Sequence, residues 1–184
     1  MLSVNMNLTF REITCFYQNY QLIILVSGFI GMNIEDYMRK AIEQALKVPA
    51  FPFGAVIVSR KTGEIVAEGF NKSSLCPTFH GEMVAINHCA KTHPSVDWSE
   101  LDLYTTAEPC PMCQSAIEWA GIAIVYYGTS MPYLQQQDWW QIEIRAAEIS
   151  SKTTFRNTRI FGGVLESECN ALFDQAPKGL FHKK

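Results

Sequence analysis

Two short motifs constrain the fold most, because their side chains have to meet at one point. His80-Gly81-Glu82 opens a predicted helix over residues 80–92, and Cys110 and Cys113 lie at the start of a second helix over 111–120. Imidazole and thiolate are ligands that zinc prefers, and a catalytic zinc site uses three protein ligands and leaves a position for water. The positive end of a helix dipole also favours the thiolate form of cysteine. The fold therefore has to bring two helix N-termini to one edge of a sheet.

From residue 34 onward the pattern alternates helices with apolar strands. Apolar residues at three- and four-residue steps predict an amphipathic first helix, and two apolar runs around the turn at Gly63 predict a β-hairpin. A hairpin followed by alternating strands and helices predicts an α/β fold with three layers, α-β-α, around a mixed five-stranded sheet. The predicted strands are 53–58, 65–70, 101–106, 122–128 and 158–161, and the predicted helices are 34–47, 80–92, 111–120, 138–151 and 164–173.

The first 31 residues do not fit this pattern. Residues 22–32 are apolar, but a membrane-spanning helix needs roughly 20 such residues. The segment before them has no clearly basic start, and no small-residue cleavage site follows, which argues against a signal peptide without excluding it. A packed element is a further alternative. We expect residues 1–31 to be an extension that reflects the choice of start site, with Met32 as the true start and 32–184 as the functional domain.

Charge and cysteine content indicate which partners and compartment to expect. The formal net charge is −3, whereas proteins that grip a polyanion usually carry a basic patch. The short basic tail, Lys178 to Lys184, is interpreted as a solvated end. A chain of 184 residues with 48% hydrophobic residues has a core that needs no disulfides, so its six cysteines indicate a reducing cytoplasm. We expect a small-molecule substrate and no membrane association.

The two motifs resemble the H-x-E and P-C-x-x-C signature of zinc-dependent nucleobase deaminases, the cytidine deaminase-like superfamily. The similarity runs from about Ile34 to Phe173 and is greatest to bacterial guanine deaminases, tRNA adenosine deaminases and fungal-type cytosine deaminases. It includes the segment 52–58 and Glu108 before the Pro-Cys motif. The resemblance implies a Zn²⁺ ion held by His80, Cys110 and Cys113, with Glu82 as the catalytic proton shuttle.

The chemistry of deamination explains why such a glutamate is needed. Zinc can lower the pKa of a bound water from about 15.7 toward 7, which makes hydroxide available at neutral pH. Attack on an amino-bearing ring carbon also requires protons to reach the ring nitrogen and the leaving amine, and Glu82 can carry them. The alternative, a structural zinc site, needs four protein ligands. His88 and Cys89 lie roughly 12 Å from His80 along the predicted helix, which is too far.

The same resemblance implies four substrate-binding residues. Asn71 is expected to bind the ring, the backbone N–H of Gly81 a ring carbonyl or nitrogen, and the carbonyl of Pro109 the departing amine. Phe53 is expected to wall the pocket. Phe79 and Trp119, like Phe53, have core packing as the alternative.

Three departures from the family pattern leave the substrate open. Gly81 replaces a frequent alanine, and Trp139 and Trp140 occupy the region where guanine deaminases have an aspartate, with Asp138 adjacent but not aligned. The two tryptophans would either stack on a base or be core residues of the helix predicted over 138–151. The segment after the strand at 122–128 also lacks the Asp- and Gly-rich loop of the tRNA enzymes.

We therefore expect a hydrolytic deaminase of a nucleobase or nucleoside, with a guanine-type purine favoured. A tRNA-specific adenosine deaminase, which converts the wobble A to I, is the first alternative, because residues 159–172 also resemble those enzymes. Cytosine or cytidine deamination is the second. A non-catalytic zinc-binding module is an alternative of another class, although Glu82 would then have no use. The family resemblance also implies a homodimer.

Overall fold

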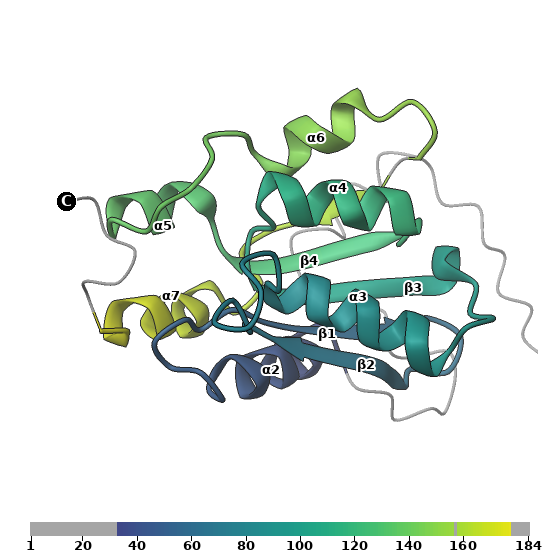
Figure 1. Cartoon of the computed structure of the whole chain (residues 1–184), viewed down its shortest axis with the longest axis horizontal. Helices are drawn as coiled ribbons and strands as arrows, with labels where there is room; N and C mark the ends of the chain where they lie inside the picture. Colours follow the sequence, from purple (N-terminus) through teal and green to yellow (C-terminus); the bar gives the residue numbers. More distant parts are fainter. Residues whose placement is uncertain (1–32, 157, 178–184) are drawn as a thin grey trace, which may run out of the picture. The chain divides into compact units, whose positions relative to one another are not determined.

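The computed structural model describes residues 33–156 and 158–177. The predicted extension over residues 1–31 and the basic tail lie outside the described residues. The elements, labelled in Figure 1, are α2 (Ile34–Ala45), β1 (Gly54–Ser59), β2 (Ile65–Phe70), α3 (Gly81–Thr92), the 3₁₀ turn η2 (Trp98–Glu100), β3 (Leu101–Ala107), α4 (Pro111–Ala120), β4 (Ile124–Thr129), α5 (Met131–Gln136), α6 (Ala146–Lys152), β5 (Arg159–Phe161) and α7 (Glu166–Gln175).

The strands form one mixed sheet of five strands in the order β2-β1-β3-β4-β5. Strand β1 pairs antiparallel with β2 and with β3, and the pairs β3–β4 and β4–β5 are parallel. This topology confirms the predicted hairpin followed by alternating strands and helices, and the predicted mixed sheet.

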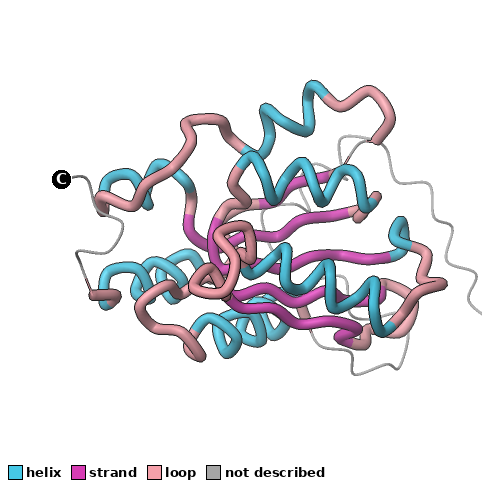
Figure 2. Tube along the Cα trace, viewed as in Figure 1, coloured by secondary structure: helices cyan, strands magenta, loops and turns pink. Residues whose placement is uncertain are grey.

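Helices cover both faces of the sheet, which confirms the three predicted layers (Figures 1 and 2). Alternate residues of β1 point to opposite faces, as strand geometry requires. Ala55 and Ile57 belong to a core cluster with residues of α3 and α4. Val56 and Val58 belong to another with residues of α2 and α7. The helices α3 and α4, which carry the two motifs, therefore pack on the same face.

A glycine brings α3 close to the sheet. A Cβ on Gly69 in β2 would lie 2.2 Å from the carbonyl oxygen of Gly81 and 2.4 Å from the backbone nitrogen of Ala85. Both distances are far inside van der Waals contact, so a side chain at position 69 would push the helix away. The position of the start of α3 therefore depends on this glycine.

The helix predicted over 138–151 is correct only over 146–151, which belong to α6, and is wrong over 138–145. Residues 137–145 form a loop between two short helices, α5 and α6. Asp138, two residues after the end of α5, has a left-handed φ of 63°. Trp139 is buried, while Ile142 is 63% exposed. The spacing of apolar residues imitates a helix, but contacts from elsewhere in the fold set the backbone here, as tertiary packing often overrides local propensity.

Two general features accompany this fold. Among the helices of residues 33–156 and 158–177, none is long and apolar enough to cross a membrane. All five cysteines in those ranges are free thiols.

Candidate metal centre and active site

The three predicted metal ligands meet at the N-termini of α3 and α4. His80 is the N-cap residue of α3, Cys110 is the N-cap residue of α4, and Cys113 lies in the first turn of α4. The ligand atoms all lie within 4.8 Å of one another, and each Sγ is 3.6 Å from Nδ1 of His80. The two helices lie on one face of the sheet with these ends at the same edge (Figure 1). The structure thus assembles one imidazole and two thiols at one point.

The donor set suits zinc. The neighbouring Cys113 thiol, helped by His80, lowers the pKa of Cys110 to about 4, so one thiolate is available at neutral pH. The same contact and burial raise the pKa of Cys113, and a cation between the two sulfurs would favour loss of that proton as well. In the part of the chain that the structure describes, no fourth Cys, His or carboxylate joins this group. Three protein ligands with an open position are typical of catalytic zinc.

Glu82 lies in the first turn of α3 and is only 3% exposed. Burial is the main cause that raises the pKa of its carboxyl, followed by the charge of Cys110. Thr105 on β3 holds the carboxyl by donating a hydrogen bond of 3.3 Å to Oε1. Sequence reasoning missed Thr105, because nothing local marks one threonine of a buried strand as the partner of a glutamate 23 residues earlier.

Three of the four predicted substrate-binding residues are held together through the backbone. The N–H of Asn71 donates to the carbonyl of Phe53 at 3.0 Å, and a Cβ on Gly81 would lie 2.7 Å from that same carbonyl oxygen. Gly81 has no positive φ, so this close approach, and not backbone freedom, requires glycine. Pro109, the fourth, is buried next to Cys110.

The side chain of Asn71 has a defined orientation. It is 7% exposed, and its Oδ1 accepts hydrogen bonds from the backbone N–H of Ser73 at 2.9 Å and from the Ser73 hydroxyl at 2.7 Å. Because the carboxamide oxygen is engaged on one side, the NH₂ group is the end of the side chain available to donate to a substrate.

The aromatic residues divide into two sets. Phe53, Trp139 and Phe173 form a cluster with ring centroids 5.0–5.6 Å apart, in which Trp139 meets both phenylalanines edge-to-face and the two phenylalanines are tilted to each other. Phe53 is therefore half-buried in this cluster, and its carbonyl is also the acceptor of the Asn71 N–H. Trp119 is 76% exposed and packs on the ring of Phe155 at 4.5 Å. Trp119 therefore lies on the outer side of α4 and not in the core.

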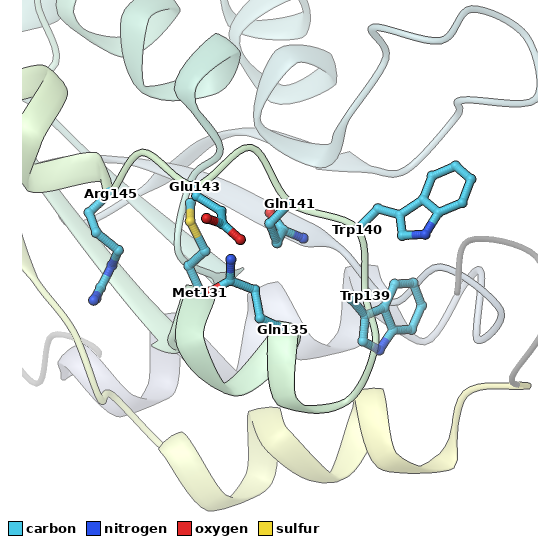
Figure 3. Close-up of a pocket in the computed structure, with 7 residues that line it drawn as sticks. All are labelled: Met131, Gln135, Trp139, Trp140, Gln141, Glu143 and Arg145. Carbon is cyan, nitrogen blue, oxygen red and sulfur yellow. The ribbon is translucent and has the colours of Figure 1, made fainter. Parts of the chain in front are cut away.

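A cavity of about 420 Å³ lies beside this aromatic cluster (Figure 3). Trp139 and Trp140 both line it, although only Trp139 is buried. Asp138 does not contribute to the lining. The lining comes entirely from α5 and the loop that follows: Met131, Gln135, Trp139, Trp140, Gln141, Glu143 and Arg145.

One further residue, Glu108, holds this segment. Its side chain is 2% exposed and accepts hydrogen bonds from Nε of Arg145 at 2.7 and 2.9 Å. It also accepts from the backbone N–H of Met131 at 3.0 Å and of Ala146 at 3.1 Å. The sequence places an acidic residue two positions before Cys110, but its partners are distant in the chain and could not be predicted.

Comparisons with known proteins agree with this arrangement. Residues 32–129 match the family model of the cytidine and deoxycytidylate deaminase zinc-binding region. The tRNA-specific adenosine deaminase of Rickettsia bellii is 30% identical over 151 residues, which cover 79% of this chain and 98% of that protein. The guanine deaminase of Bacillus subtilis is 43% identical over 102 residues, which cover 52% of this chain and 64% of that protein. The structure of a guanine deaminase from Nitrosomonas europaea superposes with a TM-score of 0.68 at 22% identity, covering 77% of this chain and 83% of that one.

Proposed function

This chain belongs to the cytidine and deoxycytidylate deaminase family, and on that premise we propose that it is a zinc-dependent hydrolytic deaminase of a guanine-type purine. The observation that carries the proposal is the convergence of His80, Cys110 and Cys113 within 4.8 Å beside a buried glutamate. A purely structural zinc site has no use for a buried Glu82 next to an open metal position.

The division of roles follows from the chemistry of the reaction. Zinc, when held by His80, Cys110 and Cys113, acts as a Lewis acid that lowers the pKa of a coordinated water. Glu82 would take up the two protons of this water one after the other, and it would pass the first to the ring nitrogen and the second to the leaving amine. The products are the ring carbonyl and ammonia. Its raised pKa suits a group that has to both take up and release a proton near neutral pH.

The predicted substrate-binding residues support a planar heterocycle as substrate. Asn71 offers an amide whose oxygen is already engaged, so its NH₂ group donates to a ring acceptor. The backbone N–H of Gly81 and the carbonyl of Pro109 flank the metal ligands and bind the ring edge and the departing amine. Phe53, packed against Trp139, provides an apolar wall.

A tRNA adenosine deaminase is the second candidate, because one observation favours it specifically. The similarity to the Rickettsia bellii enzyme extends over 98% of that protein, whereas the similarity to the Bacillus subtilis guanine deaminase covers 64%. The net charge of −3 favours the small molecule, because neutralising phosphates with Lys and Arg supplies most non-specific affinity for nucleic acid.

Assembly and location complete the proposal. We propose a homodimer in the cytoplasm. The free thiols of the described cysteines support a reducing compartment.

The first experiment joins metal analysis to ammonia release. The purified protein is screened against guanine, adenine, cytosine and their nucleosides, with Glu82→Gln beside it. We expect one zinc per chain in both proteins and a turnover at least about 10²–10⁴-fold lower in the variant, the scale of a general acid–base group. Glu118→Gln is the matched control, because Glu118 is also buried in a helix of this layer but is hydrogen-bonded away from the metal ligands.

Loss of zinc in Glu82→Gln, together with an inactive wild type, would favour a structural zinc site. A second measurement separates the two substrate classes. Guanine turnover is measured at low salt with and without an excess of a tRNA anticodon stem-loop, and the RNA is analysed for inosine. Inosine at the wobble position without turnover of any free base would contradict the small-molecule proposal.

A further inference from the structure

We propose that Glu108 is a positioning residue: its carboxylate fastens both ends of the segment 131–146 and thereby sets the shape of the cavity that this segment lines. The proposal rests on the proposed function, because it assigns the cavity to the substrate pocket of the deaminase.

The first step is the geometry of the carboxylate. One end of the segment is held by the N–H of Met131, the first residue of α5, and the other by the N–H of Ala146, the first residue of α6. Nε of Arg145 contacts both carboxylate oxygens. The buried carboxylate of Glu108 thus joins the two ends of the segment 131–146 through hydrogen bonds. Removing this carboxylate would remove the hydrogen bonds at both ends.

The second step is electrostatic. The backbone N–H groups of Met131 and Ala146 both donate to the carboxylate of Glu108, and hydrogen bonds to an ionised acceptor are stronger than neutral ones. The Arg145 guanidinium is half-exposed, with 46% of its side chain accessible, while Glu108 is buried. Loss of the buried Glu108 carboxylate should therefore disturb the segment more than loss of the half-exposed Arg145 side chain.

The third step connects the segment to the metal centre. Glu108 is followed directly by Pro109 and Cys110, so the group that fastens the segment lies two residues from a metal ligand. At the far side of the same segment, Trp139 packs against Phe53 with ring centroids 5.5 Å apart. The segment 131–146 is thus held at its two ends by Glu108, and in its middle by the packing of Trp139 on Phe53.

The fourth step concerns the cavity itself. Every residue that lines it lies between Met131 and Arg145 (Figure 3), which is the segment that Glu108 closes. Gln135, Gln141 and Glu143 bring an amide or carboxylate group to the cavity. Its other lining residues are two tryptophans, a methionine and Arg145, which itself bonds to Glu108. Because these polar groups come from loop and short-helix backbone, their positions depend on how firmly the two ends are held.

The test compares Glu108→Gln with the matched control Glu118→Gln in the full-length, zinc-loaded protein. Glu118 is likewise a buried glutamate that accepts hydrogen bonds, but from Gln114 and Thr158. In Glu108→Gln we expect faster hydrogen exchange over residues 131–146, an unchanged zinc content, and a KM for the purine that rises about tenfold or more while kcat changes less. Glu118→Gln should leave both the exchange of this segment and KM as in the wild type.

Arg145→Ala keeps the test valid if Glu108→Gln does not fold, because it removes only the half-exposed partner. Because Arg145 also lines the cavity, hydrogen exchange and not KM is the measurement for this variant. Exchange over residues 131–146 should be moderately faster than in the wild type, since both backbone N–H groups retain their acceptor, and exchange as slow as in the wild type would contradict the proposal. Unchanged exchange and unchanged KM in a zinc-loaded Glu108→Gln protein would overturn the proposal, and so would an equal rise of KM in Glu118→Gln. If the wild type deaminates no base, the proposed function fails, and hydrogen exchange still decides whether Glu108 fastens the segment.

Discussion

Asp102 at the start of β3 provides a test of the structure that is independent of catalysis. Asp102 is 8% exposed, and its Oδ1 has no hydrogen-bond partner among the described residues. Nε of Arg60 is 3.9 Å away. Burial raises the pKa of Asp102 from 3.8 to about 6, although Arg60 and Arg159 act against it. The folded protein therefore holds this proton more tightly than the unfolded chain.

The sign and size of the effect follow from linkage. Because the folded pKa is the higher one, this group favours folding below pH 3.8, and the contribution is lost as the pH rises through about 6. A tenfold change in proton affinity corresponds to about 1.4 kcal/mol. Compared with a side chain that does not titrate, Asp102 therefore lowers the free energy of unfolding by about 3 kcal/mol at pH 8 and by about 1 kcal/mol near pH 4.5. Asp102→Asn keeps the shape and removes the charge, so it should be more stable by about these amounts.

Urea unfolding of both proteins from pH 4.5 to pH 8 measures the difference directly. Asp102 lies at the start of β3, whereas Cys110 follows the other end of that strand at the start of α4, so zinc content and turnover should not change. Asp97→Asn is the control, and its effect on stability should have the opposite sign. Hydrogen bonds from Ser99 lower the pKa of Asp97, so ionised Asp97 stabilises the folded protein, and the variant should be less stable than the wild type at pH 8. The reasoning is refuted if the stability difference between Asp102→Asn and the wild type does not grow with pH.

Three further predictions concern the site and the domain. Gly81→Ala places a Cβ 2.7 Å from the carbonyl oxygen of Phe53, so it should destabilise the protein by about 1–3 kcal/mol and raise KM. Unfolding and steady-state measurements that match the wild type would contradict this. Cys113→Ala should lose zinc in metal analysis, whereas Cys89→Ala, buried outside the ligand group, should retain it; equal metal content in the two would remove Cys113 from the ligand set. A chain that begins at Met32 should keep its zinc, its activity and its melting temperature, and a large drop in melting temperature would show that residues 1–31 contribute to the fold.

The sequence by itself predicted which three residues would be positioned to hold a metal, and most of the elements. His80, Cys110 and Cys113 are predictable because each ligand type and spacing has a chemical reason. The helix over 111–120 and the hairpin around Gly63 follow from local periodicity and turn chemistry. These features depend on residues close together in the chain, where the pattern carries the information.

Only the tertiary structure decided how the pocket is built. The apolar spacing after residue 138 satisfied a helical period, yet residues 137–145 form a loop. The first residues of α5 and α6, on either side of this loop, both donate hydrogen bonds to Glu108, which is distant in the sequence. Thr105 beneath Glu82 and the carbonyl of Phe53 against Gly81 are likewise contacts between residues far apart in sequence. A buried carboxyl must find partners wherever the fold provides them, and the identity of those partners is not encoded in the residues beside it.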